Sequence, residues 1–173
     1  MIDVKALTDK QLKETQLEIL VFGPAVDPPS TDPYVASFQA KRREIKQRLI
    51  DEGHSVAFGE DIFDPTLPAH LADPLLQEIV AMKAADLIII LVGSPGAIAE
   101  AKTITSSRDL CQKAAFYCFD DHKAGLVAQH LQFMSKYGST CSLVSLPAVQ
   151  ACHLTTTVLA HVRAVQIGKA FLF

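Results

Sequence analysis

A serine, a glycine and a glutamate lie close together in the segment Ser94-Pro95-Gly96-Ala97-Ile98-Ala99-Glu100. Serine is a favoured N-cap residue and proline a favoured first helical residue, so a helix is expected to begin at Ser94-Pro95. The free amide groups at such a helix start attract anions and hydrogen-bond acceptors, such as a phosphate or sugar oxygen. Glu100 falls about one and a half turns into this helix, from which its carboxylate can reach the rim of a cleft.

A carboxylate in that place suits the chemistry of a ribose derivative. The vicinal hydroxyls of ribose bind carboxylates, and cleavage of its N-glycosidic bond develops positive charge that a carboxylate stabilises, as in glycoside hydrolysis. The residues alone leave a second interpretation equally open. In it, Ser94-Pro95-Gly96 only caps a helix and Glu100 lies on the solvated face of that helix.

The elements that must position these residues alternate between strands and helices. Asp86–Leu91 is a nearly continuous Leu/Ile run, which is typical of a strand covered on both faces. Apolar runs and turn residues predict strands at Leu17–Phe22, Ser55–Phe58, Asp86–Leu91, Ala114–Phe119 and Thr140–Val144. Helices are expected at Tyr34–Glu52, Asp73–Ala84, Pro95 to about Ser106, Gly125–Lys136 and Pro147 to about Gly168. This alternation predicts an α/β three-layer sandwich with a five-stranded parallel sheet in the flavodoxin-like, Rossmannoid order 2-1-3-4-5.

Ligands of an open parallel sheet bind beyond the carboxyl ends of its strands. Three loops there carry glycine, which lets the backbone approach a ligand closely: Gly23-Pro24-Ala25, Gly59-Glu60-Asp61 and Gly93-Ser94-Pro95-Gly96. Glu60 and Asp61 are therefore expected to approach the same space as Glu100. Glycine is also the commonest way to leave a strand, so each glycine alone carries little weight.

The composition limits the classes of function. The 173 residues are expected to form one domain, 1–173, with a polar lead-in over about residues 1–16. The formal net charge is -3 and no stretch gathers Lys and Arg, so direct nucleic-acid binding is not expected. The N-terminus lacks the apolar core of a signal peptide and the longest apolar run is too short to span a membrane. We therefore expect a cytoplasmic protein without a membrane partner.

Other polar residues carry weaker signals. Lys41-Arg42-Arg43 is expected to form a solvated helix face, with contact of Arg42 or Arg43 to a phosphate as the alternative. Asp120-Asp121-His122 is expected to be a polar turn, with sugar or base binding as the alternative. The histidines are scattered and the four cysteines read as small buried apolar residues, so no metal and no cofactor is expected. The apolar end Ala170–Phe173 closes the core or contacts a second subunit, and a homodimer or larger assembly is expected.

The strand Asp86–Leu91, followed by Ser94-Pro95-Gly96 and Glu100, resembles the strand-loop-helix segment of the nucleoside 2-deoxyribosyltransferase-like superfamily. There a Ser/Gly loop precedes a helix that bears the catalytic glutamate. The related TIR-like NAD hydrolases and the LOG/SLOG group, whose motif is P-G-G-x-G-T-x-E, share an N-glycosidic substrate and a helical glutamate. The resemblance covers Leu17 to about Ile104, and Ala101-Lys102 departs from the Leu or Met and then Gly that usually follow the glutamate.

The resemblance implies a role for each matched residue. Glu100 would be the nucleophile or oxocarbenium stabiliser, and Ser94 and Gly96 would contact the sugar or phosphate. The remaining substrate-binding positions expected around them are Gly23, Pro24, Glu60, Asp61, Gly93 and Pro95. The implied function is cleavage of the N-glycosidic bond of a nucleoside, nucleotide or NAD-like ligand by hydrolysis or deoxyribosyl transfer. The alternative is a nucleotide-sensing domain of the SLOG or TIR-like kind that binds its ligand without cleaving it.

Overall fold

Five parallel strands form one sheet in the order β2-β1-β3-β4-β5. The computed structural model describes residues 4–122 and 125–171. The strands are β1 Glu18–Phe22, β2 Ser55–Phe58, β3 Leu87–Val92, β4 Ala114–Phe119 and β5 Thr140–Val144. Both the α/β class and the predicted strand order are confirmed, and the strand bounds lie within one residue of those expected from the sequence.

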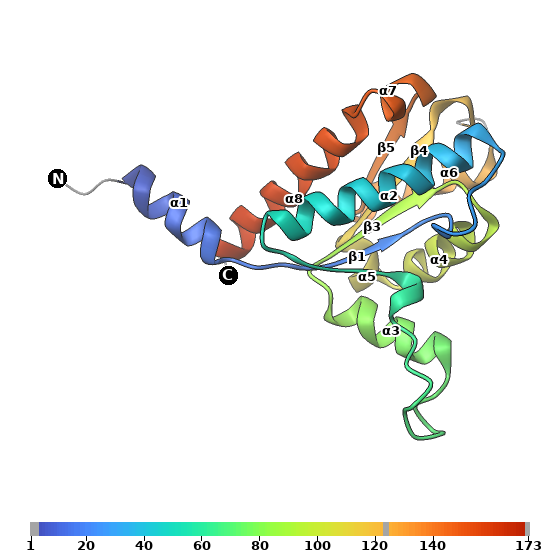
Figure 1. Cartoon of the computed structure of the whole chain (residues 1–173), viewed down its shortest axis with the longest axis horizontal. Helices are drawn as coiled ribbons and strands as arrows, with labels where there is room; N and C mark the ends of the chain where they lie inside the picture. The colour runs from blue at the N-terminus through green and yellow to red at the C-terminus, as the bar shows by residue number, and fades with distance from the viewer. Residues whose placement is uncertain (1–3, 123–124, 172–173) are drawn as a thin grey trace.

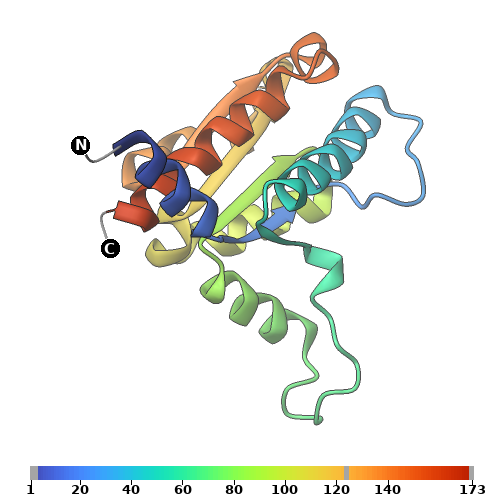
Figure 2. The ribbon, with the colours of Figure 1, turned by 60° about the vertical axis from the view of Figure 1, so that its left-hand side comes forward.

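Helices cover both faces of this sheet (Figure 1). One face is packed by α2 Pro33–Asp51, α7 Leu146–Gln150 and α8 His153–Phe171. The other is packed by α3 Pro74–Ala84, α4 Pro95–Thr105, α5 Arg108–Gln112 and α6 Leu126–Met134. The first helix, α1 Val4–Glu14, lies beside the end of α8, away from the sheet (Figure 2). Single 3-10 turns lie at Gly59–Asp61, Asp120–His122 and Ser135–Tyr137.

Strand β3 shows why the sheet needs two helical layers. All six of its side chains are buried. Because successive side chains of a strand point to opposite faces, Leu87, Ile89 and Leu91 enter the core under α2 and α8. Ile88, Ile90 and Val92 enter the core under α3, α4 and α5. A run of apolar residues without alternation thus fills both cores at once.

The predicted helix from Pro147 to about Gly168 is in fact two helices, and this prediction was wrong. The break lies at Cys152, whose φ is 65°, in the left-handed region that a helix cannot pass through. Neither Gly nor Pro stands at the break, so the sequence carried no signal for it. A short helix, α5, was also not predicted.

The cysteines divide into buried and exposed ones. Cys111 and Cys118 are buried as expected, and Cys141 is partly buried. Cys152 is exposed, which corrects its assignment to the core. It sits at the turn between α7 and α8.

The described residues contain no helix long and apolar enough to cross a membrane. Of the apolar end Ala170–Phe173, residues 172–173 lie outside the described part of the chain. Phe171 is half exposed, at 50%. The start of the expected lead-in, residues 1–3, is likewise outside the description.

Candidate functional site

A cavity of about 700 Å³ opens where β1, β2 and β3 end. This is the edge at which the strand order reverses, the usual place for ligands in such sheets. Its volume lies in the range of small-molecule sites. The lining residues are Gly23, Ala25, Gly59, Glu60, Ile62, Phe63, Pro74, Leu75, Glu78, Ser94, Gly96 and Glu100.

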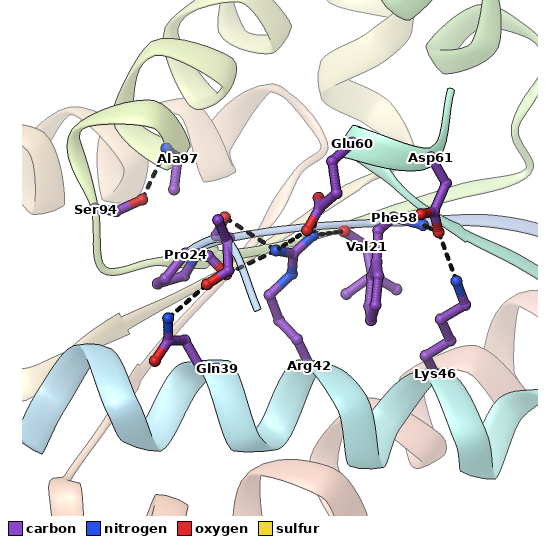
Figure 3. A network of polar contacts seen from close by, with 12 residues as sticks. Val21, Pro24, Gln39, Arg42, Lys46, Phe58, Glu60, Asp61, Ser94 and Ala97 are labelled. Carbon is purple, nitrogen blue, oxygen red and sulfur yellow. Dashed lines mark hydrogen bonds and ion pairs between the residues drawn. The ribbon is translucent and has the colours of Figure 1, made fainter. Parts of the chain in front are cut away.

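The start of α4 forms one wall of this cavity. Ser94 is the N-cap, and its Oγ accepts a hydrogen bond from the Ala97 amide at 3.2 Å (Figure 3). Pro95 occupies the first helical position, as expected from its fixed φ. The helix therefore begins at the residue the sequence indicated, and Ser94 and Gly96 both face the cavity.

Glu100 lies further along the same wall. Its side chain is partly buried, and Oε2 is enclosed without a hydrogen-bond partner among the described residues. Burial raises the pKa of this carboxyl to about 7, and the negative charges of Glu78 and Glu60 add to the effect against the lowering influence of Arg42. A buried carboxyl with a strongly raised pKa in a cleft is characteristic of functional sites.

On the opposite wall, a buried arginine binds the carboxylate of Glu60. Arg42 on α2 is fully buried, and its NH1 and NH2 donate to the two Glu60 carboxylate oxygens at 3.0 and 2.7 Å. The same guanidinium donates to the carbonyls of Val21 and Pro24 at 2.8 and 2.7 Å (Figure 3). The expectation of a solvated Arg42 was therefore wrong. Arg42 turns inward because the carbonyls that end β1 need donors there.

Two of the predicted loop glycines in the cavity lining are also required by packing inside the protein. A Cβ on Gly59 would lie 2.5 Å from the Phe22 ring. A Cβ on Gly23 would lie 2.9 Å from the Arg42 side chain and 3.2 Å from the Leu91 carbonyl oxygen. Both glycines still line the cavity. Their presence is thus explained before any ligand is considered.

Four predicted site residues lie outside the cavity lining. Asp61 accepts from Lys46 Nζ at 2.6 Å and from the Phe58 amide at 3.1 Å, which turns its carboxylate toward α2 (Figure 3). Pro24 is buried behind the wall, and Pro95 is exposed at the start of α4. A Cβ on Gly93 would lie 2.7 Å from the ring of Phe38, so this glycine serves the contact of β3 with α2.

Two residues that matter to the site were missed. Glu78 on α3 lines the cavity, and burial raises the pKa of its carboxyl. The sequence offered no signal for Glu78, because this residue lies within α3 and in none of the three glycine loops. Arg42 was noticed only as part of a basic run. A single cation at helical spacing from Phe38 and Ile45, both core residues, was the available clue.

The remaining candidates lie elsewhere. Arg43 donates to the Val26 carbonyl and to Asp27 Oδ1, the latter at 2.8 Å. Asp121 accepts from the Tyr34 hydroxyl at 2.7 Å, away from the cavity lining. Among the described residues, no three His, Cys, Asp or Glu side chains gather in a way that would hold a metal ion.

Comparison with known protein families and with characterised proteins finds no match to this chain.

Proposed function

We propose that this protein cleaves the N-glycosidic bond of a nucleoside-like ligand, by hydrolysis or by deoxyribosyl transfer, with Glu100 as the catalytic carboxylate. The observation that carries the proposal is the unpartnered Oε2 of Glu100, enclosed at the edge of a cavity of about 700 Å³. A buried polar atom without a partner is costly, and a catalytic role is one of the reasons for which proteins retain such a group.

The chemistry follows from the two forms of this carboxyl. With a pKa of about 7, Glu100 is divided between its ionised and protonated forms at neutral pH. The ionised form attacks the anomeric carbon while the C–N bond breaks and its electron pair leaves with the base, or it stabilises the oxocarbenium charge that develops in this step. Water, or a second base in deoxyribosyl transfer, then bonds to the anomeric carbon and releases the sugar from the site. Because the site is partly desolvated, that stabilisation is stronger than it would be in water.

The charge of the cavity favours a substrate without a phosphate group. Three glutamates, Glu60, Glu78 and Glu100, line it, and no Lys, Arg or His of the described residues belongs to the lining. Arg42 lies behind the wall and already pairs with Glu60. Like charges repel at close range, so a nucleoside is preferred over the corresponding nucleotide.

The walls also offer surfaces for the two parts of a nucleoside. Phe63 and Leu75 present apolar area, 46% and 53% exposed, against which a base can pack. Glu60 keeps free lone pairs on its carboxylate after pairing with Arg42, and these can accept from ribose hydroxyls. Arg42 acts as a positioning residue, since it fixes the Glu60 carboxylate.

The test is release of free base from a panel of nucleosides, their 5′-monophosphates and NAD, followed by chromatography. Base release from one or more nucleosides is expected, and Glu100→Gln should lower its rate at least 100-fold. Glu18→Gln is the matched control, because Glu18 is an exposed carboxylate at the opposite edge of the sheet. Activity unchanged in Glu100→Gln would contradict the mechanism.

The same samples also test the alternative in which the protein binds its ligand without cleaving it. Ligand binding measured by calorimetry, with no base release from either the wild type or Glu100→Gln, would replace the enzyme by a sensing domain. If base is released faster from monophosphates than from nucleosides, the glutamates of the cavity do not disfavour a phosphate group. That result would leave the role of Glu100 untouched.

We also propose that the chain acts in the cytoplasm as a homodimer or larger assembly. Supporting this, Leu76 and Val80 on α3 are 39% and 58% exposed, and Phe171 on α8 is 50% exposed. Apolar area of this kind is commonly covered by another copy. Light scattering after size exclusion should give at least twice the monomer mass of 18.8 kDa.

A further inference from the structure

A second cavity, of about 330 Å³, lies at the amino-terminal edge of the sheet. It is formed where the chain enters β1 and β2, at the opposite ends of these strands from the Glu100 cavity. Its lining residues are Leu12, Lys13, Glu52, His54, Leu159, Arg163 and Gln166. They come from α1, from the turn between α2 and β2, and from α8.

His54 is the buried polar residue of this cavity, with 5% of its surface exposed. Its Nδ1 accepts a hydrogen bond from the Leu17 amide at 3.4 Å. A ring nitrogen that accepts carries no proton, so the neutral imidazole has its proton on Nε2. Nε2 has no hydrogen-bond partner in residues 4–122 and 125–171, and it is not among the enclosed polar atoms that lack one. The Nε2–H donor therefore reaches the cavity that the ring lines.

Arg163 is held beside this donor by a buried amide. Its NH1 donates to Gln166 Oε1 at 2.7 Å, and Gln166 Nε2 donates to the carbonyls of Leu12 and Thr15 at 2.8 and 2.9 Å. Gln166 is itself 5% exposed. Because one guanidinium nitrogen is fixed in this way, the remaining N–H groups of Arg163 are pre-oriented and stay available to a ligand.

The charges around the ring come from three elements. Arg163 on α8 lowers the pKa of His54 and Glu52, at the end of α2, raises it, while burial is the largest influence and lowers it. Lys13 on α1 adds a second cation to the lining. The cavity is thus lined by the neutral N–H donor of the ring, by two cationic side chains and by one carboxylate.

We infer that this cavity binds a small molecule through an anionic group, either a phosphate or a carboxylate. The His54 Nε2–H, the Arg163 guanidinium and the Lys13 ammonium would donate to the oxygens of that group. Charge-assisted hydrogen bonds of this kind are the stronger ones in proteins. Glu52 would accept from a hydroxyl or amine of the same molecule. The inference does not depend on the proposed function, because the two cavities share no residue.

The test is a titration of the full chain, followed by ¹H–¹⁵N NMR at pH 7.5, with sodium phosphate in one arm and sodium acetate in the other. Sodium chloride at equal ionic strength serves as the reference. The Leu17 amide and the His54 ring nitrogens are the reporters, because they are joined by a hydrogen bond. A saturable shift of both reporters with millimolar affinity is expected in at least one arm, and that arm identifies the anion class.

Arg163→Met should weaken this affinity at least tenfold, and the exposed Lys13→Met should weaken it about threefold. Arg48→Met, which removes an exposed cation from α2, is the matched control and should leave the affinity unchanged. Shifts that match those in chloride, or equal affinities in Arg163→Met and the wild type, would overturn the inference. Because Lys13 is exposed, its variant keeps the test valid should Arg163→Met fail to fold.

Discussion

The two walls of the Glu100 cavity treat their carboxylates in opposite ways. On the β2 side, Glu60 receives two hydrogen bonds from the fully buried Arg42. On the α4 side, Glu100 has an enclosed oxygen that no described residue partners, and its pKa is raised to about 7. One carboxylate is built into the fold, whereas the other is held at a cost to stability. Proteins tolerate such a cost mainly where a ligand makes use of it.

The largest effect on stability is expected when the cation on the β2 side is removed. Arg42→Met removes the cation that pairs with Glu60 and the donor that reaches the carbonyls of Val21 and Pro24. Loss of one partner of a buried pair is strongly destabilising. Because the Glu60 side chain is 42% exposed, we expect a loss of about 3 kcal/mol in the free energy of unfolding, at the lower end for such pairs.

Urea denaturation measures this loss. Arg48→Met, an exposed arginine on the same helix, should change the free energy of unfolding by less than about 0.5 kcal/mol. A loss below about 1 kcal/mol in Arg42→Met would mean that the two walls do not differ as described.

The next effect concerns the α4 side and has the opposite sign. Glu100→Gln removes a carboxyl that must ionise in a poorly solvated place, so it should stabilise the protein at pH 8. The shift from 4.5 to about 7 corresponds to roughly 3 kcal/mol. Solvent screening of the partly exposed group reduces the expected gain to about 1–2 kcal/mol.

The raised pKa of Glu100 makes the stability of the protein depend on pH. In the folded protein Glu100 holds its proton to higher pH than in the unfolded chain, so the free energy of unfolding falls as pH rises from 4.5 to about 7. The stabilisation in Glu100→Gln should thus be full above pH 7 and vanish below pH 4.5. Thermal unfolding across this range checks it, and a gain independent of pH would rule out the charge as its source.

The smallest effect on stability is expected for Ser94→Ala, which separates helix capping from the chemistry of Glu100. Ser94→Ala removes the acceptor for the Ala97 amide and should cost about 1 kcal/mol. Ser145→Ala is the matched control, since Ser145 caps α7 through the Ala148 amide at 3.3 Å. Both variants should lose similar stability by urea denaturation. Only Ser94→Ala should alter base release, because Ser145 lies outside the cavity lining.

Much of the fold could be predicted because local signals agreed with one another. The run Asp86–Leu91 predicts a buried strand and Ser94-Pro95 predicts a helix start. The structure has the strand at Leu87–Val92, one residue later, and α4 begins at the expected residues. The break at Cys152 could not be predicted, since a residue other than Gly in the left-handed region is set by packing and not by local preference. In the same way, the inward turn of Arg42 depends on tertiary contacts with the carbonyls of β1 and of the loop after it.

The sequence predicted the position of the Glu100 cavity better than it predicted the contacts of the individual side chains. Glu60 and Glu100 were placed by the ends of β2 and β3, and both line the cavity. Asp61, one residue from Glu60, lies outside the lining because Lys46 binds it. Which of two neighbouring carboxylates faces a cavity is decided by tertiary partners, and the sequence order does not reveal them.

The most direct test of the central claim is a ¹³C NMR titration of the Glu100 side-chain carboxyl, assigned by the absence of its signal in Glu100→Gln. The unpartnered, partly buried carboxyl described above should titrate with a pKa of about 7. A pKa near 4.5, the value of an ordinary glutamate, would contradict the account, because Glu100 would then be a solvated residue of α4 with no special chemistry.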